Sequence, residues 1–246
     1  MDKLQKISKQ KFKRNKKKKL NIISVIPARA GSKGIKNKNM SLLNKRPLIT
    51  YTFNALNKSK MKESYVLSDS KKIRNLARSY NINSKYIRPA SVSKNTTSLS
   101  DTLFNFYLWT KKNSIYFDYL LILQPTSPLR QSKDINNAVN IIRKSKSKSL
   151  FSISESLEHP YEVIKIKGKK WSHIFKNSKK FYRRQDFNLN SFFINGAIYV
   201  IHRNLIKKKK IYDPKNHKFL MMPKKRSLEI NDIDELKMVE SIIKNL

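Results

Sequence analysis

Residues 22–39 constrain the fold of this chain more than any other stretch. The first five, 22–26, are mostly apolar and rich in β-branched residues, follow a long polar stretch and stop at Pro27. Such a run is typical of a strand that is buried on both faces, as in a parallel sheet. The loop after it holds two of the chain's four glycines and four cations, namely Gly31, Gly34, Arg29, Lys33, Lys36 and Lys38.

This small, basic loop has two interpretations. Small residues let the backbone approach a ligand closely, and cations with exposed N–H groups favour phosphate oxygens. The loop therefore predicts a polyphosphate cradle. In a chain this basic, a solvated surface loop would have the same composition, and short glycine-containing loops are weak motifs. The loop is neither a Walker loop, because no Gly-Lys-Ser/Thr ends it, nor the Gly-x-Gly-x-x-Gly dinucleotide fingerprint.

Strand-like and helix-like patterns alternate along the first part of the chain. Short apolar runs predict further strands at 65–67, 119–123 and 150–153, with 85–87 as another candidate. Helices are expected between them, at 47–56, 71–80, 102–109 and 133–143. This alternation argues for parallel βαβ units and hence for an α/β fold.

The alternation stops between residues 158 and 195. Two β-like runs flank Gly168 there, as in a hairpin, and we expect a small β-rich excursion from the main sheet that serves dimerisation. Strands expected at 195–201 and 219–222 resume the main fold. The chain closes with a helix whose apolar positions follow 3,4 spacing, namely Ile233, Leu236, Val239 and Ile243.

Composition limits the class of protein. The 246 residues are enough for one large α/β domain, expected over 21–246. The net charge is +39, and residues 1–20 hold ten Lys/Arg and one Asp, so we expect a disordered basic tail there. Without cysteine the chain has no disulfide, thiolate zinc site or Cys nucleophile. It also has neither a long apolar run nor the apolar core of a secretory signal, and a cytoplasmic location is expected.

Two polar segments carry further candidate residues. The loop after the strand at 119–123 offers Gln124, Thr126 and Ser127, and ligands of open parallel sheets bind beyond the carboxyl ends of the strands. Four of the chain's 16 acids lie within seven residues near the C-terminus, namely Glu229, Asp232, Asp234 and Glu235. These acids are either the N-terminal charge of a helix or hard oxygen ligands for Mg²⁺.

Taken together, these segments resemble the CMP-sialic acid synthetases, also called acylneuraminate cytidylyltransferases. The matching stretches, in the family's order, are Pro27-Ala28-Arg29-Ala30-Gly31-Ser32-Lys33-Gly34 with Lys38-Asn39, Arg88-Pro89-Ala90, Leu123-Gln124-Pro125-Thr126-Ser127-Pro128-Leu129-Arg130, Arg184-Gln185-Asp186, Asn195-Gly196-Ala197-Ile198-Tyr199 and the acidic segment from Ser227. The resemblance covers residues 21–246. The run from Leu123, combined with the first loop, is its most specific part.

The resemblance implies a fold and a reaction. The fold is the Rossmann-like nucleotide-diphospho-sugar transferase fold, a three-layer α/β/α sandwich on a mainly parallel sheet, usually in a homodimer. In the reaction, CTP and a nine-carbon 2-keto sugar acid such as N-acetylneuraminate give a CMP-sugar and pyrophosphate. The anomeric hydroxyl attacks the α-phosphorus, and cations together with Mg²⁺ stabilise the departing pyrophosphate.

By matched position, the resemblance assigns roles to individual residues. The catalytic candidates are Arg29, Lys38 and Gln124. The nucleotide-binding candidates are Ala28, Arg29, Gly31, Ser32, Lys33, Lys38, Asn39, Arg88, Ser98 and Thr126. The sugar-binding candidates are Gln124, Arg184, Gln185 and Tyr199, because an arginine suits the sugar carboxylate. The metal-binding candidates are Glu229, Asn231 and Asp232.

The chain departs from the family pattern in two places. The family usually has Asp-Ile-Asp where this chain has Glu229-Ile230-Asn231. Asn231 would then coordinate through its amide oxygen, or Asp232 would replace it, and a homologue with weakened metal chemistry is an alternative. Several members carry an arginine where this chain has Phe192-Phe193-Ile194, which keeps legionaminic and pseudaminic acid open as substrates.

Two rival assignments follow from the same residues. The Kdo-activating cytidylyltransferases typically have Arg-Leu-Pro-x-Lys in their first loop and lack Gly-Ser-Lys-Gly, so this chain matches them less well. A rival from another class is a basic nucleic-acid-binding protein without turnover, with the tail as its binding segment. Its affinity would fall steeply with salt.

Overall fold

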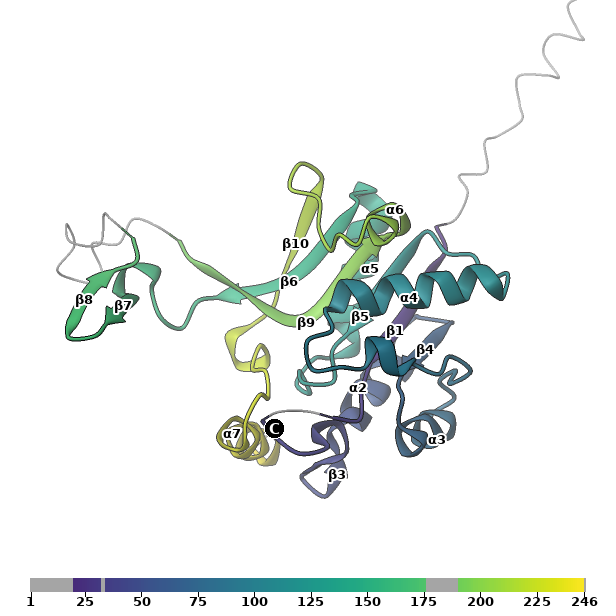
Figure 1. Ribbon diagram of the computed structural model, residues 1–246, viewed down its shortest axis with the longest axis horizontal. Helices are drawn as coiled ribbons and strands as arrows, with labels where there is room; N and C mark the ends of the chain where they lie inside the picture. The colour runs from purple at the N-terminus through teal and green to yellow at the C-terminus, as the bar shows by residue number, and fades with distance from the viewer. Residues whose placement is uncertain (1–19, 32–33, 176–189, 246) are drawn as a thin grey trace, which may run out of the picture.

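A six-stranded sheet forms the centre of the protein in the computed structural model, which describes residues 20–31, 34–175 and 190–245 (Figure 1). The strand order is β10-β6-β9-β5-β1-β4. The bounds are β1 Ile22–Pro27, β4 Ser64–Leu67, β5 Tyr119–Leu123, β6 Ser149–Glu155, β9 Phe192–His202 and β10 His217–Met221. β1 runs parallel to β4 and β5, and β6 to β10, whereas β9 is antiparallel to both neighbours. The expected mainly parallel sheet is confirmed.

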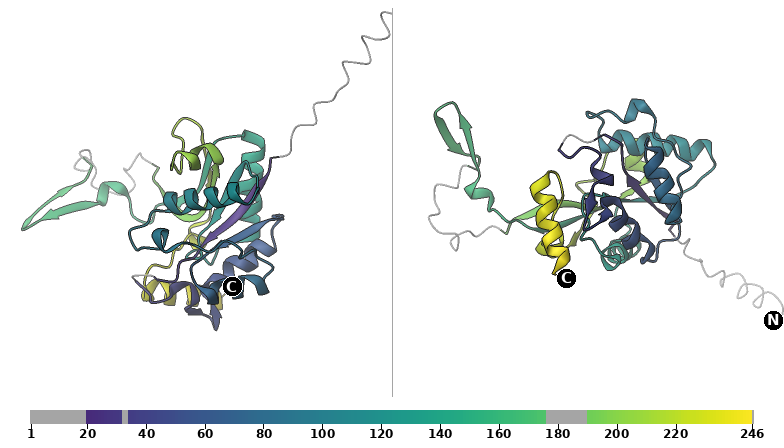
Figure 2. Two further views of the ribbon diagram at one scale, coloured as in Figure 1. Left: turned by 45° about the vertical axis from the view of Figure 1, so that its right-hand side comes forward. Right: turned by 90° about the horizontal axis from the view of Figure 1, so that it is seen from below.

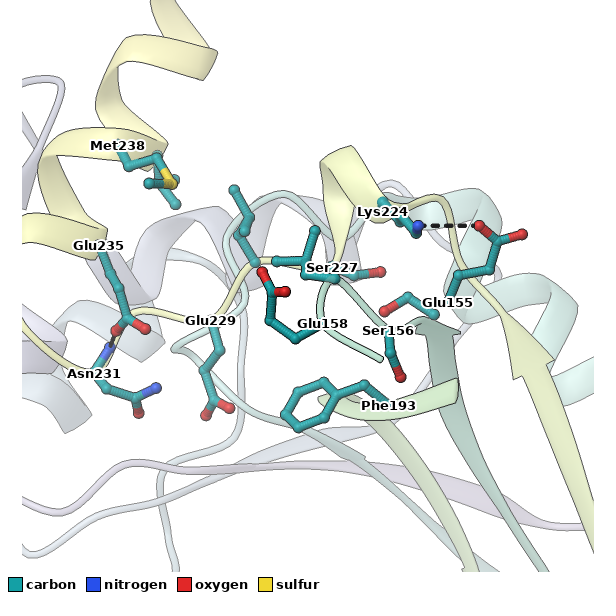
Figure 3. A pocket seen from close by; sticks show the side chains of 14 residues that line it. Glu155, Ser156, Glu158, Phe193, Lys224, Ser227, Glu229, Asn231, Glu235 and Met238 are labelled. Atoms are coloured by element: carbon teal, nitrogen blue, oxygen red, sulfur yellow. Dashed lines mark hydrogen bonds and ion pairs between the residues drawn. The ribbon is translucent and has the colours of Figure 1, made fainter. Parts of the chain in front are cut away.

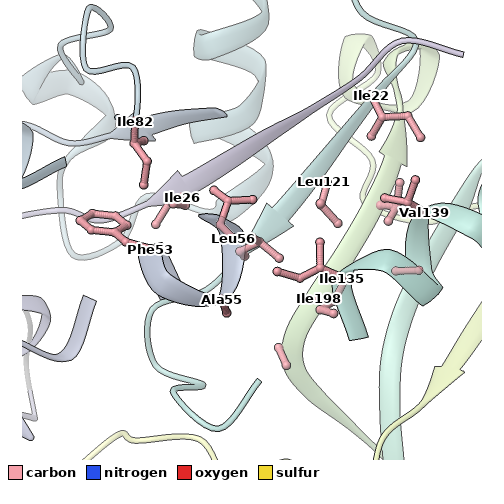
Figure 4. Packing of buried hydrophobic residues seen from close by; sticks show 14 of the residues in the cluster. Ile22, Ile26, Phe53, Ala55, Leu56, Ile82, Leu121, Ile135, Val139 and Ile198 are labelled. Atoms are coloured by element: carbon pink, nitrogen blue, oxygen red, sulfur yellow. The ribbon is translucent and has the colours of Figure 1, made fainter. Parts of the chain in front are cut away.

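Helices cover both faces of this sheet (Figures 1 and 2). They are α2 Leu48–Asn57, α3 Lys71–Ser79, α4 Leu99–Lys112, α5 Ser132–Ser145 and α6 Arg203–Lys207, whereas α7 Ile233–Lys244 packs in a separate cluster with Leu48 at the start of α2. On one face Ile26 of β1 belongs to a buried cluster with Phe53 of α2 and Val139 of α5 (Figure 4). On the other face Leu120 of β5 lies in a cluster with Phe106 of α4. Successive strand residues point to opposite faces, so the apolar runs of β1 and β5 fill both cores and the three-layer prediction is confirmed.

Polar caps determine where two of the helices begin. The Ser98 hydroxyl accepts a hydrogen bond from the backbone N–H of Asp101, 3.0 Å away, so α4 starts at Leu99 and not at 102 as expected. Gln131 caps α5 in a capping box with Asp134, and Ser132 is therefore the first helical residue. In both cases the side chain satisfies backbone N–H groups that the first helical turn leaves unpaired.

The expected strand at 85–87 is absent. Two isolated bridges, Tyr65 to Asn83 and Ser68 to Ile87, are the only pairing of this stretch in the described part of the chain. Pro89 follows at once and has no N–H to extend a ladder. Tyr86 is buried in the aromatic cluster under α4, with its ring edge-on to Phe106. Side-chain packing therefore holds this stretch beside β4 in place of a regular ladder.

A wide bulge interrupts β9 where it passes β6. Phe151 pairs with Tyr199 and Ile153 with Ile194, so β9 advances five residues while β6 advances two. Gly196 lies in the bulge with φ +68°, a backbone conformation that glycine adopts without strain. The strand expected at 195–201 therefore begins earlier, at Phe192, and contains a bulge.

Between β6 and β9 the chain leaves the sheet as an arm. β7 (Ile164–Lys167) and β8 (Lys170–His173) form an antiparallel hairpin around Gly168, whose φ is +59°. The hairpin projects away from the sheet in every view (Figures 1 and 2). A hairpin around Gly168 is thus confirmed, whereas its use in dimerisation stays a prediction.

The other elements are short. They are the 3₁₀ helices η1 Lys38–Met40, η2 Ala90–Val92, η3 Pro160–Glu162 and η6 Lys224–Arg226, and the two-stranded ladder of β2 Leu42–Leu43 with β3 Arg46–Pro47. Across the described ranges, every helix is too short or too polar to span a bilayer. The expected disordered tail lies, except for Leu20, outside the described residues.

Candidate active site

A cavity of about 460 Å³ opens beyond the carboxyl ends of β1 and β5. Residues expected at the site line it from four separate stretches, namely Arg29, Gly31, Lys38 and Asn39, then Arg88 and Ser98, then Gln124 and Thr126, and finally Asn231. The sequence had no signal for three further lining residues, Thr97, Leu99 and Thr102. The cavity lies where ligands of open α/β sheets bind.

The cradle, residues 28–39, is held in place by its own polar contacts. The backbone N–H of Ala30 donates to Asp69 Oδ1 at 2.8 Å. Asn39 Nδ2 donates to the carbonyl oxygen of Arg29 at 3.0 Å, and the Arg29 guanidinium donates to Asn95 Oδ1. Asn39 and Asp69 therefore shape the loop backbone. Ser32 and Lys33 lie outside the described residues.

Lys38 joins the cradle to the C-terminal acidic segment, residues 227–232. Its Nζ donates to the carbonyl oxygen of Ile230 at 2.9 Å, although the two residues are far apart in the sequence. Partial burial lowers the pKa of Lys38, and the carboxylates of Glu229 and Glu235 oppose that shift. The ammonium group is thus held at the cavity wall, close to both segments.

Gly34 is in direct contact with the same segment. A Cβ atom at this position would overlap the backbone carbonyl oxygen of Asn231. Only a residue without a side chain lets the cradle lie this close to residue 231.

Gly34→Ala should therefore raise the dissociation constant for CTP about tenfold, because relieving an overlap of this kind typically costs about 1–3 kcal/mol. Gly31→Ala is the matched comparison, since among the described residues beyond its chain neighbours a Cβ there would come no closer than 3.9 Å, to Arg29 Nη1. Calorimetric titration with CTP measures both variants. A larger loss at Gly31 than at Gly34 would contradict the steric account.

Arg88 and Ser98 have structural partners besides their place in the cavity wall. Arg88 Nε donates to the carbonyl oxygen of Val92 at 2.7 Å, and burial lowers the pKa of this guanidinium. The Ser98 hydroxyl donates to Asp101 Oδ2 at 2.7 Å while it caps α4. Both side chains position the wall of the cavity, and their contact with cytidine stays a prediction.

The residues of the acidic segment lie in two different surroundings, and each of the two interpretations of the C-terminal carboxylates applies to one of them. Asp232 is the N-cap of α7, because its Oδ1 accepts from the N–H groups of Asp234 at 3.0 Å and Glu235 at 2.9 Å. Glu229 Oε1 instead accepts from the Thr126 hydroxyl at 2.8 Å, and Asn231 lines the cavity. The helix-charge interpretation thus applies to Asp232, which is exposed and turned to the helix, whereas Asn231 lines the cavity and Glu229 contacts Thr126 of its wall.

The donors at and beside the cavity, Asn231 and Glu229, fit a magnesium ion bound together with substrate. In the described ranges, no three His, Asp or Glu side chains gather closely enough to hold a metal alone. Mg²⁺ usually takes one or two carboxylates and completes its shell with phosphate oxygens and water. One carboxylate from Glu229 and one amide oxygen from Asn231 fit that pattern.

The predicted sugar side lies next to Glu229. A Cβ at Gly196 would come within 3.2 Å of Glu229 Oε2, so the bulge of β9 makes room for this carboxylate. Tyr199 is half-buried, with its ring 6.2 Å from that of Phe151. Burial and, to a lesser extent, the charge of Glu229 raise the pKa of the Tyr199 hydroxyl. Arg184 and Gln185 lie outside the described residues.

A second cavity of about 470 Å³ lies on the other side of the acidic segment (Figure 3). Its lining mixes apolar side chains such as Phe193 and Met238 with carboxylates such as Glu229 and Glu235. Asn231 lines both cavities. The acidic segment is therefore the wall between two openings.

Comparisons with known proteins agree with this geometry. A family model described as "Cytidylyltransferase" matches residues 23–242. The chain is 30% identical over 223 residues to the CMP-N,N'-diacetyllegionaminic acid synthase of Legionella pneumophila, covering 86% of this chain and 91% of that protein. It is 30% identical over 216 residues to the N-acylneuraminate cytidylyltransferase of Streptococcus agalactiae, covering 87% of this chain but only 51% of that protein.

A solved structure shows the same fold. A CMP:2-keto-3-deoxy-manno-octonic acid synthetase complexed with CTP superposes with a TM-score of 0.68 at 13% identity, over 92% of this chain and 99% of that one. At this identity the likeness establishes the fold alone. The match over residues 23–242 shows more, because it includes every described segment of the cavity wall: the chain belongs to the cytidylyltransferase family.

Proposed function

We propose that this enzyme transfers CMP from CTP to the anomeric hydroxyl of a nine-carbon 2-keto sugar acid and releases pyrophosphate. The observation that carries the proposal is the convergence of Arg29, Lys38, Gln124 and Asn231 on one cavity at the carboxyl ends of β1 and β5. Together with Arg88, Arg29 and Lys38 give the described wall three cations, which favour binding of a triphosphate. A reaction that consumes CTP also supports a cytoplasmic location.

In the proposed reaction the sugar hydroxyl attacks the α-phosphorus, its proton leaves, and the bond to pyrophosphate breaks. Arg29 and Lys38 would hold the triphosphate and offset the negative charge that grows on the leaving group. Gln124 would hold the sugar beside the α-phosphate. Mg²⁺ held by Glu229 and Asn231 would neutralise charge on the triphosphate.

The sugar acid is an N-acylated nonulosonic acid in this proposal, with N,N'-diacetyllegionaminate as the first candidate. The Legionella relative named for that sugar matches the chain over 91% of its own length. Phe192, Phe193 and Ile194 are exposed apolar side chains where several sialic acid enzymes carry an arginine. From Tyr199 an aromatic face continues through Phe151 to the exposed Phe219. The ring centroids of Phe151 and Phe219 are 5.4 Å apart. Apolar surface of this kind favours a sugar with two N-acetyl groups over a more hydroxylated one.

Pyrophosphate release from CTP and Mg²⁺ tests the substrate against a panel of N-acetylneuraminate, N,N'-diacetyllegionaminate, pseudaminate and Kdo. We expect turnover with one of the N-acylated nine-carbon acids and at most a trace with Kdo. Turnover with Kdo alone would overturn the proposed substrate class. Absence of both turnover and CTP binding would overturn the proposed function itself.

We further propose that the enzyme works as a homodimer held together through the arm. Ile166 is 71% exposed and Trp171 is 64% exposed, and the two pair across the hairpin on one face. Ile164 on the same strand is exposed as well. A contiguous apolar patch on a segment that projects into solvent is typical of a protein–protein interface, and tryptophan is often its energetic centre.

The double variant Ile166→Ser/Trp171→Ser should raise the dimer dissociation constant about a hundredfold or more, because losing two buried apolar anchors typically costs about 2–4 kcal/mol or more. Light scattering over a concentration series measures this. Leu42→Ser is the matched control, since Leu42 is 63% exposed but lies on β2 in the body of the protein. A wild-type protein that stays monomeric at high concentration would contradict the homodimer.

A further inference from the structure

Arg130 is a buried arginine that lies between β5 and β9, at the end of the strands where their pairing stops. The antiparallel ladder of β5 and β9 ends with Leu123 opposite Ile198. The next two residues, Gln124 and Ala197, do not pair. Instead, Nη1 of Arg130 donates to the carbonyl oxygen of Gln124 at 3.0 Å and to that of Ala197 at 2.8 Å.

The guanidinium has a third acceptor on a third element. Its Nη2 donates to the hydroxyl of Thr52 on α2. One side chain thus ties the loop after β5, the bulge of β9 and a helix of the adjoining layer to one another. A planar guanidinium offers five donors in fixed directions, and a lysine ammonium cannot reproduce that geometry.

Stability alone explains this residue poorly. Arg130 is only 3% exposed, and its Nε has no hydrogen-bond partner among the described residues. Burial lowers the pKa of the Arg130 guanidinium and the charge of Asp134 opposes that shift, but Asp134 forms its ion pair with Arg226. Burying a cation without a direct counter-ion is costly. At a ligand-binding edge of the sheet, such a group is better explained by the positions of the neighbouring segments that it fixes.

We propose that Arg130 is a positioning residue that sets the separation of the ends of β5 and β9. It would thereby fix Gln124, at the end of β5, relative to Tyr199 on β9. This inference rests on the proposed function, in which both side chains face the sugar. Without the guanidinium, two buried carbonyl oxygens would lose their shared donor, and the strand ends would have to move apart or take up water.

The first test is a double-mutant cycle with Arg130→Lys and Gln124→Ala. We expect Arg130→Lys to lower the turnover number about a hundredfold, since a misplacement of about 1 Å costs about that factor, while the KM for CTP stays nearly unchanged and the KM for the sugar rises. If Arg130 acts through Gln124, the double variant loses little more than Gln124→Ala alone. Fully additive losses would overturn the proposal.

The control is Arg78→Lys, at an arginine that is exposed, whereas Arg130 is buried. Arg78 on α3 also uses its guanidinium in protein hydrogen bonds, with Nε donating to Ser84 Oγ at 2.8 Å, but it lies outside the cavity wall. We expect its kinetic constants to equal those of the wild type. An equal fall in turnover in both variants would show that losing any such arginine acts through general structure, and would overturn the specific role of Arg130.

Backbone hydrogen exchange gives a readout that does not depend on turnover. In Arg130→Lys we expect faster exchange confined to residues 124–130 and 195–199, whereas acceleration across the whole sheet would overturn the positioning role. If Arg130→Lys does not fold, Thr52→Val removes one acceptor and should give the same local pattern at smaller amplitude; no local change would overturn the proposal. A wild-type protein that is inactive with every sugar would count against the proposed function, while the exchange pattern would still decide the role of Arg130.

Discussion

Replacing Lys38 with alanine should lower the turnover number about a thousandfold, which corresponds to about 4 kcal/mol of activation free energy. The Lys38 ammonium lies at the cavity wall and is held there by the carbonyl oxygen of Ile230 at 2.9 Å. A fixed cation is worth most where negative charge grows on a leaving group in a partly dehydrated site. Steady-state kinetics with CTP, Mg²⁺ and the accepted sugar measure the loss.

The fold should survive this substitution. Lys38 is only half-buried, and one hydrogen bond of this kind contributes about 1 kcal/mol to stability. Lys36→Ala is the matched control, because Lys36 is exposed on the same loop and does not line the cavity; its turnover should stay within about threefold of the wild type. An active Lys38→Ala enzyme would refute the assignment.

Glu229→Gln should lower turnover about a hundredfold and weaken Mg²⁺ binding in the presence of CTP. The amide oxygen can still accept the hydrogen bond from the Thr126 hydroxyl, now 2.8 Å from Glu229 Oε1, so the local structure is kept. The change removes a negative charge from the proposed metal site, where Mg²⁺ depends on few carboxylates. Calorimetric titration of Mg²⁺ into the complex with a non-reactive CTP analogue measures the affinity without turnover.

Asn231→Asp is the paired variant for this prediction. It restores the second carboxylate of the family's usual pattern at a position that lines the cavity. Mg²⁺ affinity should rise in this variant and fall in Glu229→Gln. If both variants bind Mg²⁺ as the wild type does, the metal site lies elsewhere. Asp232→Ala should mainly destabilise α7, because the side chain of Asp232 caps that helix.

The parts of the fold that were predictable from sequence are those with a local pattern. The apolar runs of β1 and β5 follow from burial on both faces, and α7 follows from its 3,4 spacing. The antiparallel direction of β9 was not predictable, because alternation along a strand does not reveal its neighbour. The stretch at 85–87 looked like a strand, but packing of Tyr86 and the following Pro89 decided its conformation.

The candidate site was predictable where a motif carries it. Arg29 and Lys38 come from the cradle and Gln124 from the loop after β5, and all three line one cavity. What could not be predicted are the long-range contacts that hold them, such as Asp69 to the N–H of Ala30 or Arg130 to the bulge of β9. An arginine in a loop gives no local signal of burial, because buried arginines are rare and depend on distant acceptors. The separate places of Asp232 and Glu229 likewise depend on where α7 begins.

The proposed reaction is best tested by identifying, with ³¹P NMR and mass spectrometry, the product formed from CTP, Mg²⁺ and N,N'-diacetyllegionaminate. We expect one phosphodiester that links cytidine to the sugar acid, together with an equal amount of pyrophosphate. In Lys38→Ala, the rate of its formation should fall about a thousandfold. The proposed reaction would be contradicted if CTP stayed intact with this sugar and with every other sugar of the panel, and if the protein also showed no saturable CTP binding.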